Sequence, residues 1–234
     1  MRLLVSPKDV AEARIAVDGG ADIIDVKNPA EGSLGANFPW VIREVKKILP
    51  EGRELSATIG DFPNLPGTAS LAAVGAVSCG VDYVKVGLKG ARSLKEGIAL
   101  AEAVARAVKD EDAGVKVVCC GYADYERVGS VDVSSIPEIA KSAGADYAMI
   151  DTALKDGRSL LDFLSKRDVS SFIEESHGGG LLVALGGSIS INDLGFLKEV
   201  GVDVVGVRGA VCENDRGSVL SLEKVRLFSK ALKG

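Results

Sequence analysis

An internal repeat constrains this chain more than any other feature. A segment that opens with glycine, a small residue and aspartate and continues as an apolar run occurs four times, at residues 20–27, 80–87, 144–151 and 201–208. Further apolar runs of strand length lie between these copies, at residues 2–6, 54–60, 115–121 and 181–187. Amphipathic stretches such as residues 93–109 separate the runs. The pattern predicts eight strand–helix units, two for each copy of the repeat.

Strands that are apolar throughout and alternate with helices are typical of a parallel sheet that helices cover. Eight such units favour closure of the sheet, and 234 residues with 47% hydrophobic content are enough for one sizeable core. We therefore predict an α/β fold, a single (β/α)8 TIM-type barrel that forms one domain over residues 1–234. An open doubly wound sheet is the alternative.

The repeat also predicts which side chains face the barrel interior, because side chains alternate along a strand. The glycine of each copy is expected to end the preceding helix, and the aspartate to have a structural role near the bottom of the strand. The first and third residues after the glycine are expected to fill the barrel interior. They are Ala21, Val81, Ala145 and Val202, followed by Ile23, Tyr83, Tyr147 and Val204.

Charged residues dominate the next two positions on the same face. These positions carry Asp25, Lys85, Met149 and Gly206, and then Lys27, Gly87, Asp151 and Arg208. Both lie at the carboxyl ends of the strands, where barrel enzymes build their active sites. A purely structural salt-bridge network is the alternative, but desolvation makes buried ion pairs weak stabilisers. We therefore favour a catalytic site.

Two lysines at one mouth have a chemical consequence. Neighbouring ammonium groups disfavour each other's charge, so one lysine can be a free amine near neutral pH. A free amine attacks carbonyl groups, and the protonated imine that forms withdraws electrons from the adjacent carbon. A neighbouring carboxylate can then act as general base and later as general acid.

The loops after the last two strands suggest an anionic substrate, since phosphate sites in barrels often lie there. The stretch 185–190 carries glycines that permit close approach of an anion and a serine expected to cap a helix, and Arg208 adds a charge. The predicted phosphate-binding residues are Gly186, Gly187, Ser188, Arg208 and Gly209. Lys155, in the polar loop 151–163, either reaches a second phosphate or is a solvated loop lysine.

Composition excludes several other functions. The net charge of −5 and the lack of a basic stripe argue against nucleic acid as a partner. The sequence contains neither a run long enough to span a membrane nor a signal peptide, so a cytoplasmic location is expected. Four cysteines without a C-x-x-C pair and one histidine form no zinc set, and we expect no metal or organic cofactor. Whether the chain forms a homo-oligomer stays open.

Minor features have structural interpretations. His177 is expected at a helix end at the bottom of the barrel, and Cys120 to be an ordinary buried cysteine. The stretch 27–40 is long and contains the glycines and prolines of a lid, and residues 60–70 could form a similar rim.

Five motifs carry a resemblance to a known family. "SP" after the first strand, "DVKNPAEGSLGA", "YVKVGL", "MIDTALKDG" and "ALGGSI" resemble the (5-formylfuran-3-yl)methyl phosphate synthases of methanogenic archaea and some methylotrophs. The resemblance covers essentially the whole chain.

The resemblance implies a TIM-type barrel that condenses two molecules of glyceraldehyde 3-phosphate into a phosphorylated furaldehyde, the furan precursor of methanofuran, with loss of phosphate and water. It implies Lys27 as the Schiff-base lysine, assisted by Asp25, Lys85, Asp151 and Lys155. The residues alone leave two alternatives. One is a class I aldolase or isomerase-like barrel acting on another small sugar phosphate, and the other is a non-catalytic sensor of a phosphorylated ligand.

Overall fold

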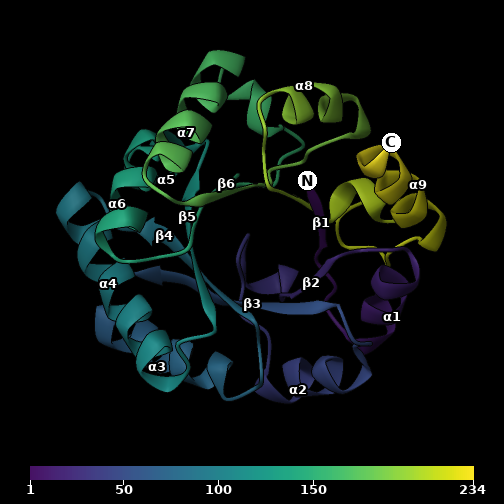
Figure 1. Cartoon of the computed structure of the whole chain (residues 1–234), viewed down its shortest axis with the longest axis horizontal. Helices are drawn as coiled ribbons and strands as arrows, with labels where there is room; N and C mark the ends of the chain where they lie inside the picture. The colour runs from purple at the N-terminus through teal and green to yellow at the C-terminus, as the bar shows by residue number, and fades with distance from the viewer.

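Eight parallel strands close into a barrel with the helices outside it (Figure 1). The structure is a computed structural model that describes all residues 1–234. Each strand pairs with its sequence neighbour, and β8 (Val204–Val207) pairs with β1 (Arg2–Val5), which closes the ring. The last helix, α9 (Leu222–Lys233), lies beside the first, α1 (Val10–Asp18). The predicted barrel is confirmed, and the open sheet is excluded.

All eight predicted strands are present. The remaining six are β2 (Ile23–Val26), β3 (Glu54–Pro63), β4 (Tyr83–Gly90), β5 (Lys116–Tyr122), β6 (Tyr147–Asp151) and β7 (Leu182–Leu185). The other helices of the outer ring are α2 (Pro39–Ile48), α3 (Pro66–Val77), α4 (Leu94–Glu111), α5 (Tyr125–Val128), α6 (Ile136–Ser142), α7 (Lys166–Gly178) and α8 (Leu194–Glu199).

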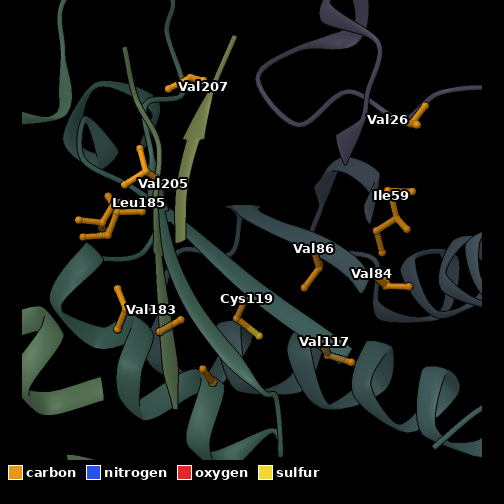
Figure 2. Close-up of a cluster of buried hydrophobic side chains, with 14 of the residues drawn as sticks. Val26, Ile59, Val84, Val86, Val117, Cys119, Val183, Leu185, Val205 and Val207 are labelled. Carbon is orange, nitrogen blue, oxygen red and sulfur yellow. The ribbon is translucent and has the colours of Figure 1, made fainter. Parts of the chain in front are cut away.

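Two separate sets of buried side chains hold the barrel together. The outward-facing residues of the strands pack against the helices in a cluster of 56 buried residues, ten of which Figure 2 labels. A second cluster of 12 residues fills the barrel interior and includes Ile23, Tyr83, Tyr147 and Val204, as predicted. The alternation of side chains along each strand therefore has the predicted parity.

One predicted layer of the interior is wrong. Ala21, Val81 and Val202 belong to the outer cluster, and Ala145 packs against it. These residues precede the strands, which begin at the third residue after each glycine. The alternation that holds within a strand does not extend into the turn before it, so this layer joins the helix contacts instead.

The glycine and aspartate of the repeat have the predicted structural roles. Gly20, Gly80, Gly144 and Gly201 have positive φ and follow helices. Each aspartate accepts a hydrogen bond from a backbone N–H of the preceding strand, as in Asp22 to Leu3 N at 2.9 Å and Asp203 to Val183 N at 2.8 Å. His177 lies in the last turn of α7 and contacts Asp203, which confirms its position at the bottom of the barrel.

Candidate active site

A cavity of about 380 Å³ opens at the carboxyl ends of β6, β7, β8, β1 and β2. Nine of the ten predicted site residues line it, and the exception is Asp25. The nine are Lys27, Lys85, Asp151, Lys155, Gly186, Gly187, Ser188, Arg208 and Gly209. Across all its lining residues the cavity carries five cationic side chains and two carboxylates, so its field favours an anionic ligand.

Asp25 lies beneath this cavity and is fully buried. Its carboxylate accepts hydrogen bonds from Ser6 Oγ at 2.9 Å, from Ser56 Oγ at 2.8 Å and from Lys85 Nζ at 2.7 Å. Burial favours the neutral acid, but the charges of Lys85 and Lys27 outweigh burial and hold the pKa of Asp25 below its ordinary value. Asp25 is therefore an ionised group that fixes the position of Lys85.

Lys27, at the end of β2, differs from the other lysines of the site. It is only 6% exposed, and its Nζ forms no hydrogen bond or ion pair within the chain. Burial lowers the pKa of Lys27 to about 7; Asp151 opposes this shift and the charge of Lys85 adds to it. A buried amine with this pKa is largely neutral in mildly alkaline solution and can act as a nucleophile.

Asp151 and Lys155 form a pair on the opposite wall. Lys155 Nζ donates to Asp151 Oδ1 at 2.6 Å and to Thr152 Oγ1 at 3.0 Å. Burial would raise the pKa of Asp151, but Lys155 and Lys27 hold it well below its ordinary range. A side chain at Gly186 would lie 3.3 Å from the Asp151 carboxyl carbon, so the glycine leaves this carboxylate free to face the cavity.

The loop after β7 exposes backbone donors to the cavity. The N–H groups of Gly187, Ser188 and Ile189 form no hydrogen bond within the chain. Gly187 and Ser188 both have positive φ, 91° and 55°, a conformation rarely seen for serine. The sequence predicted that Ser188 caps a helix, and this prediction is wrong. Ser190 caps the short helical turn Ile191–Asp193 instead, through reciprocal hydrogen bonds with Asp193.

Arg208 lines the cavity, but its guanidinium is already occupied. It donates to Glu12 on α1 at 2.7 Å, to the Ser6 carbonyl at 2.7 Å, and to backbone carbonyls of residues 216 and 218. Both side chains of the Arg208–Glu12 pair are 2% exposed. The structure therefore gives Arg208 a partner that its strand position did not reveal, and no donor of its guanidinium is left for a phosphate.

A second arginine, Arg216, lines the same cavity. Arg216 lies at the tip of a short hairpin after β8, where Cys212 pairs with Leu220. Its side chain makes one hydrogen bond, to the Gly32 carbonyl at 3.4 Å. Sequence reasoning missed Arg216 because it stopped at residue 212, although a polar turn at the carboxyl end of a barrel strand is a usual place for site residues.

Residues 32–35, in the stretch predicted as a lid and here called the lid, lie across the mouth of the barrel. Leu34 enters the barrel interior and is fully buried. Hydrogen bonds tie the loop to three sides of the barrel: Thr58 Oγ1 donates to Gly35 O at 2.8 Å, Ser33 Oγ donates to Thr152 O at 2.8 Å, and Arg216 reaches Gly32 O.

A pair of residues beneath the lid was also missed. Tyr122 donates a hydrogen bond to Asp61, and the other oxygen of Asp61 accepts from Leu34 N at 3.3 Å. Burial, followed by the charge of Asp61, raises the pKa of Tyr122 well above its ordinary value.

The predicted rim at 60–70 is largely regular structure, because β3 extends to Pro63 and α3 begins at Pro66.

Two structural findings concern cofactors and membranes. No group of three or more His, Cys, Asp or Glu side chains is arranged to hold a metal ion. None of the helices combines the length and the apolar character that crossing a bilayer requires.

Comparison with known proteins identifies close relatives. Residues 3–229 match the family model described as 4-HFC-P synthase. The chain is 53% identical to the (5-formylfuran-3-yl)methyl phosphate synthase of Archaeoglobus fulgidus over 235 residues, with 100% of both chains covered. It is 55% identical to the enzyme of that name from Methanocaldococcus jannaschii, with 91% of each covered.

Solved structures show a likeness in fold alone. The phosphoribosyl anthranilate isomerase of Thermus thermophilus superposes with a TM-score of 0.68 at 16% identity, over 100% of this chain and 98% of that one. A 3-hexulose-6-phosphate synthase superposes with a TM-score of 0.66 at 17% identity, over 97% and 99%.

Proposed function

Because the chain belongs to the 4-HFC-P synthase family, we propose that it forms (5-formylfuran-3-yl)methyl phosphate from two molecules of glyceraldehyde 3-phosphate through a Schiff base on Lys27. The product would serve methanofuran biosynthesis. The state of Lys27 carries this proposal, since it is the only lysine of the cavity without a hydrogen bond or an ion pair.

In the first step, the neutral Nζ of Lys27 adds to the aldehyde carbon of one triose phosphate. Water leaves, and a protonated imine forms, which makes the hydrogen on the adjacent carbon acidic. Asp151 is ionised and lines the cavity, so we assign it the removal of this proton.

Loss of this proton expels phosphate from the next carbon and leaves an enol on the imine. The carbon that carried the phosphate then attacks the carbonyl carbon of the second triose phosphate, after a proton shift has converted that triose to its 2-keto isomer. Lys155 is 2.6 Å from Asp151 and can donate a proton to the carbonyl oxygen as the carbon–carbon bond forms. Ring closure through the terminal hydroxyl of the second triose and loss of two water molecules yield the furan, and hydrolysis of the imine releases the formyl group and returns Lys27.

Lys85 and Asp25 support this chemistry from beneath. The charge of Lys85 lowers the pKa of Lys27, and Asp25 holds Lys85 in place. Ser6, Ser56 and Lys85 donate hydrogen bonds to Asp25, which does not line the cavity. We therefore assign Asp25 a positioning role and assign proton transfer to Asp151.

Product analysis tests this function. Purified protein incubated with glyceraldehyde 3-phosphate is expected to release inorganic phosphate together with a product that absorbs in the near ultraviolet, as a furaldehyde does. Lys27→Arg is expected to abolish both signals, because a guanidinium does not form an imine under these conditions. An aldol product without ultraviolet absorption would favour a class I aldolase instead.

A further inference from the structure

The five cationic side chains of the cavity differ in whether they form an ion pair with a carboxylate. Three of the five are ion-paired: Lys85 with Asp25 at 2.7 Å, Lys155 with Asp151 at 2.6 Å, and Arg208 with Glu12 at 2.7 Å. The other two, Lys27 and Arg216, have no carboxylate within ion-pair distance. These two groups are the ones available to a ligand.

The two unpaired cations are chemically different. Lys27 can lose its proton near neutral pH, whereas a guanidinium stays charged throughout the physiological range. Burial acts against the charge of Arg216, and the side chain still lines the cavity. Asp151 offsets part of this cost from beyond ion-pair distance, and a bound anion would offset more of it.

The surroundings of Arg216 supply the rest of an anion site. A Cβ built on Gly209 would lie 3.9 Å from the Arg216 Cβ, so the guanidinium arm begins beside the first turn after β8. Gly209 and Ala210 are the first residues of that turn, and their N–H groups form no hydrogen bond within it. The free N–H groups of Gly187, Ser188 and Ile189 border the same cavity.

Arg208 holds this arrangement in place. Its Nε donates to the Arg216 carbonyl at 2.9 Å, and its Nη2 donates to the Ser218 carbonyl at 3.4 Å, while Glu12 neutralises it. The buried pair therefore fixes the backbone of the hairpin from which the Arg216 side chain extends. One arginine positions the loop, and the other remains free for a ligand.

We propose that Arg216 binds a phosphate group of the substrate together with the backbone N–H groups after β7 and β8, and that its contact with Gly32 couples this binding to the lid. The identity of the ligand as a phosphorylated aldehyde rests on the proposed function. The anion site itself does not.

Calorimetric titration with inorganic phosphate tests the site without turnover. Arg216→Gln is expected to weaken phosphate binding by about tenfold to a hundredfold, the loss typical of a charge-assisted hydrogen bond. Arg216→Lys should retain an intermediate affinity, because it keeps the charge but loses the planar donor pair. Arg106→Gln removes an equal charge from an exposed position on α4 and should bind phosphate as the wild type does.

Equal phosphate affinity in Arg216→Gln and wild type, or no saturable binding by the wild type, would overturn the proposal. In steady-state assays, Arg216→Gln is expected to raise KM for glyceraldehyde 3-phosphate more than it lowers kcat, and an unchanged KM would also contradict it. If the wild type makes no furan, the proposed function fails, while the phosphate titration still decides the role of Arg216.

Discussion

Lys27 is an amine placed where water is largely excluded and no carboxylate contacts it. Removing an ammonium from water disfavours its charged form, and the nearby charge of Lys85 acts in the same direction. The negative charge of Asp151 acts in the opposite direction. The balance brings the pKa of Lys27 to about 7, which is where an imine-forming lysine is most useful.

Competitive labelling with acetic anhydride measures this property of Lys27. The labelling rate of Lys27 should rise with pH, pass half its maximum near pH 7 and level off between about pH 8 and 9, because only the neutral amine reacts. A lysine side chain in a model peptide has a pKa of about 10.4 and is still mostly protonated in that range. Peptide mass mapping follows each lysine separately, and a Lys27 profile that matches the exposed lysines would contradict the assignment.

Lys85→Gln should shift this profile to higher pH for two reasons. It removes a like charge, and it leaves the Asp25 carboxylate free to stabilise the Lys27 ammonium. Lys95→Gln, at an exposed position on α4, is the matched control and should leave the profile unchanged.

Glu12 offers a test of the buried Arg208 pair. Glu12→Gln removes the charge that neutralises a guanidinium whose side chain is 2% exposed. Breaking a buried pair on one side costs about 3–5 kcal/mol, so urea unfolding should show a loss of that size. Glu44→Gln breaks an exposed pair with Lys47 and should stay within the ~1 kcal/mol typical of such pairs. Equal losses in both variants would refute the structural role of Glu12.

At the scale of elements, the lid depends on close packing against Gly87, within β4. A Cβ on Gly87 would lie 2.4 Å from Asp61 Oδ1, 2.5 Å from the Tyr122 hydroxyl and 3.1 Å from Leu34 Cδ1. Gly87→Ala should therefore separate Asp61 from Tyr122 and displace Leu34. We expect a loss of about 1–3 kcal/mol in stability, as for other overpacked interiors, and faster proteolysis within residues 28–36.

Gly75→Ala is the matched control for this change. Gly75 lies in α3, and a Cβ there meets nothing within 4 Å. Alanine should raise the free energy of unfolding by about 0.5–1 kcal/mol, because glycine weakens a helix interior. If Gly87→Ala proved as well tolerated, the close approach at Gly87 would not be what fastens the lid.

At the scale of the whole molecule, the barrel and the identity of the charged set were predictable. Both follow from a local rule, the alternation of side chains along a strand, applied to a repeat that marks four of the eight strands. The rule failed at Ala21, Val81 and Val202, where the chain is still in the turn.

The partners of the charged residues were not predictable, because they come from distant parts of the chain. Glu12 is 196 residues from Arg208, and Asp61 is 61 residues from Tyr122. No local pattern marks such pairs. The sequence therefore predicts Arg208 as the phosphate ligand. The structure favours Arg216 for this role, because the guanidinium of Arg208 already bonds to Glu12 and to backbone carbonyls.

The proposed mechanism requires a covalent intermediate on Lys27. Borohydride reduction in the presence of glyceraldehyde 3-phosphate, followed by peptide mass mapping, would trap it. We expect a stable adduct on Lys27 that is absent without substrate and absent in Lys27→Arg. An adduct on Lys85 or Lys155, or none on any lysine, would contradict it.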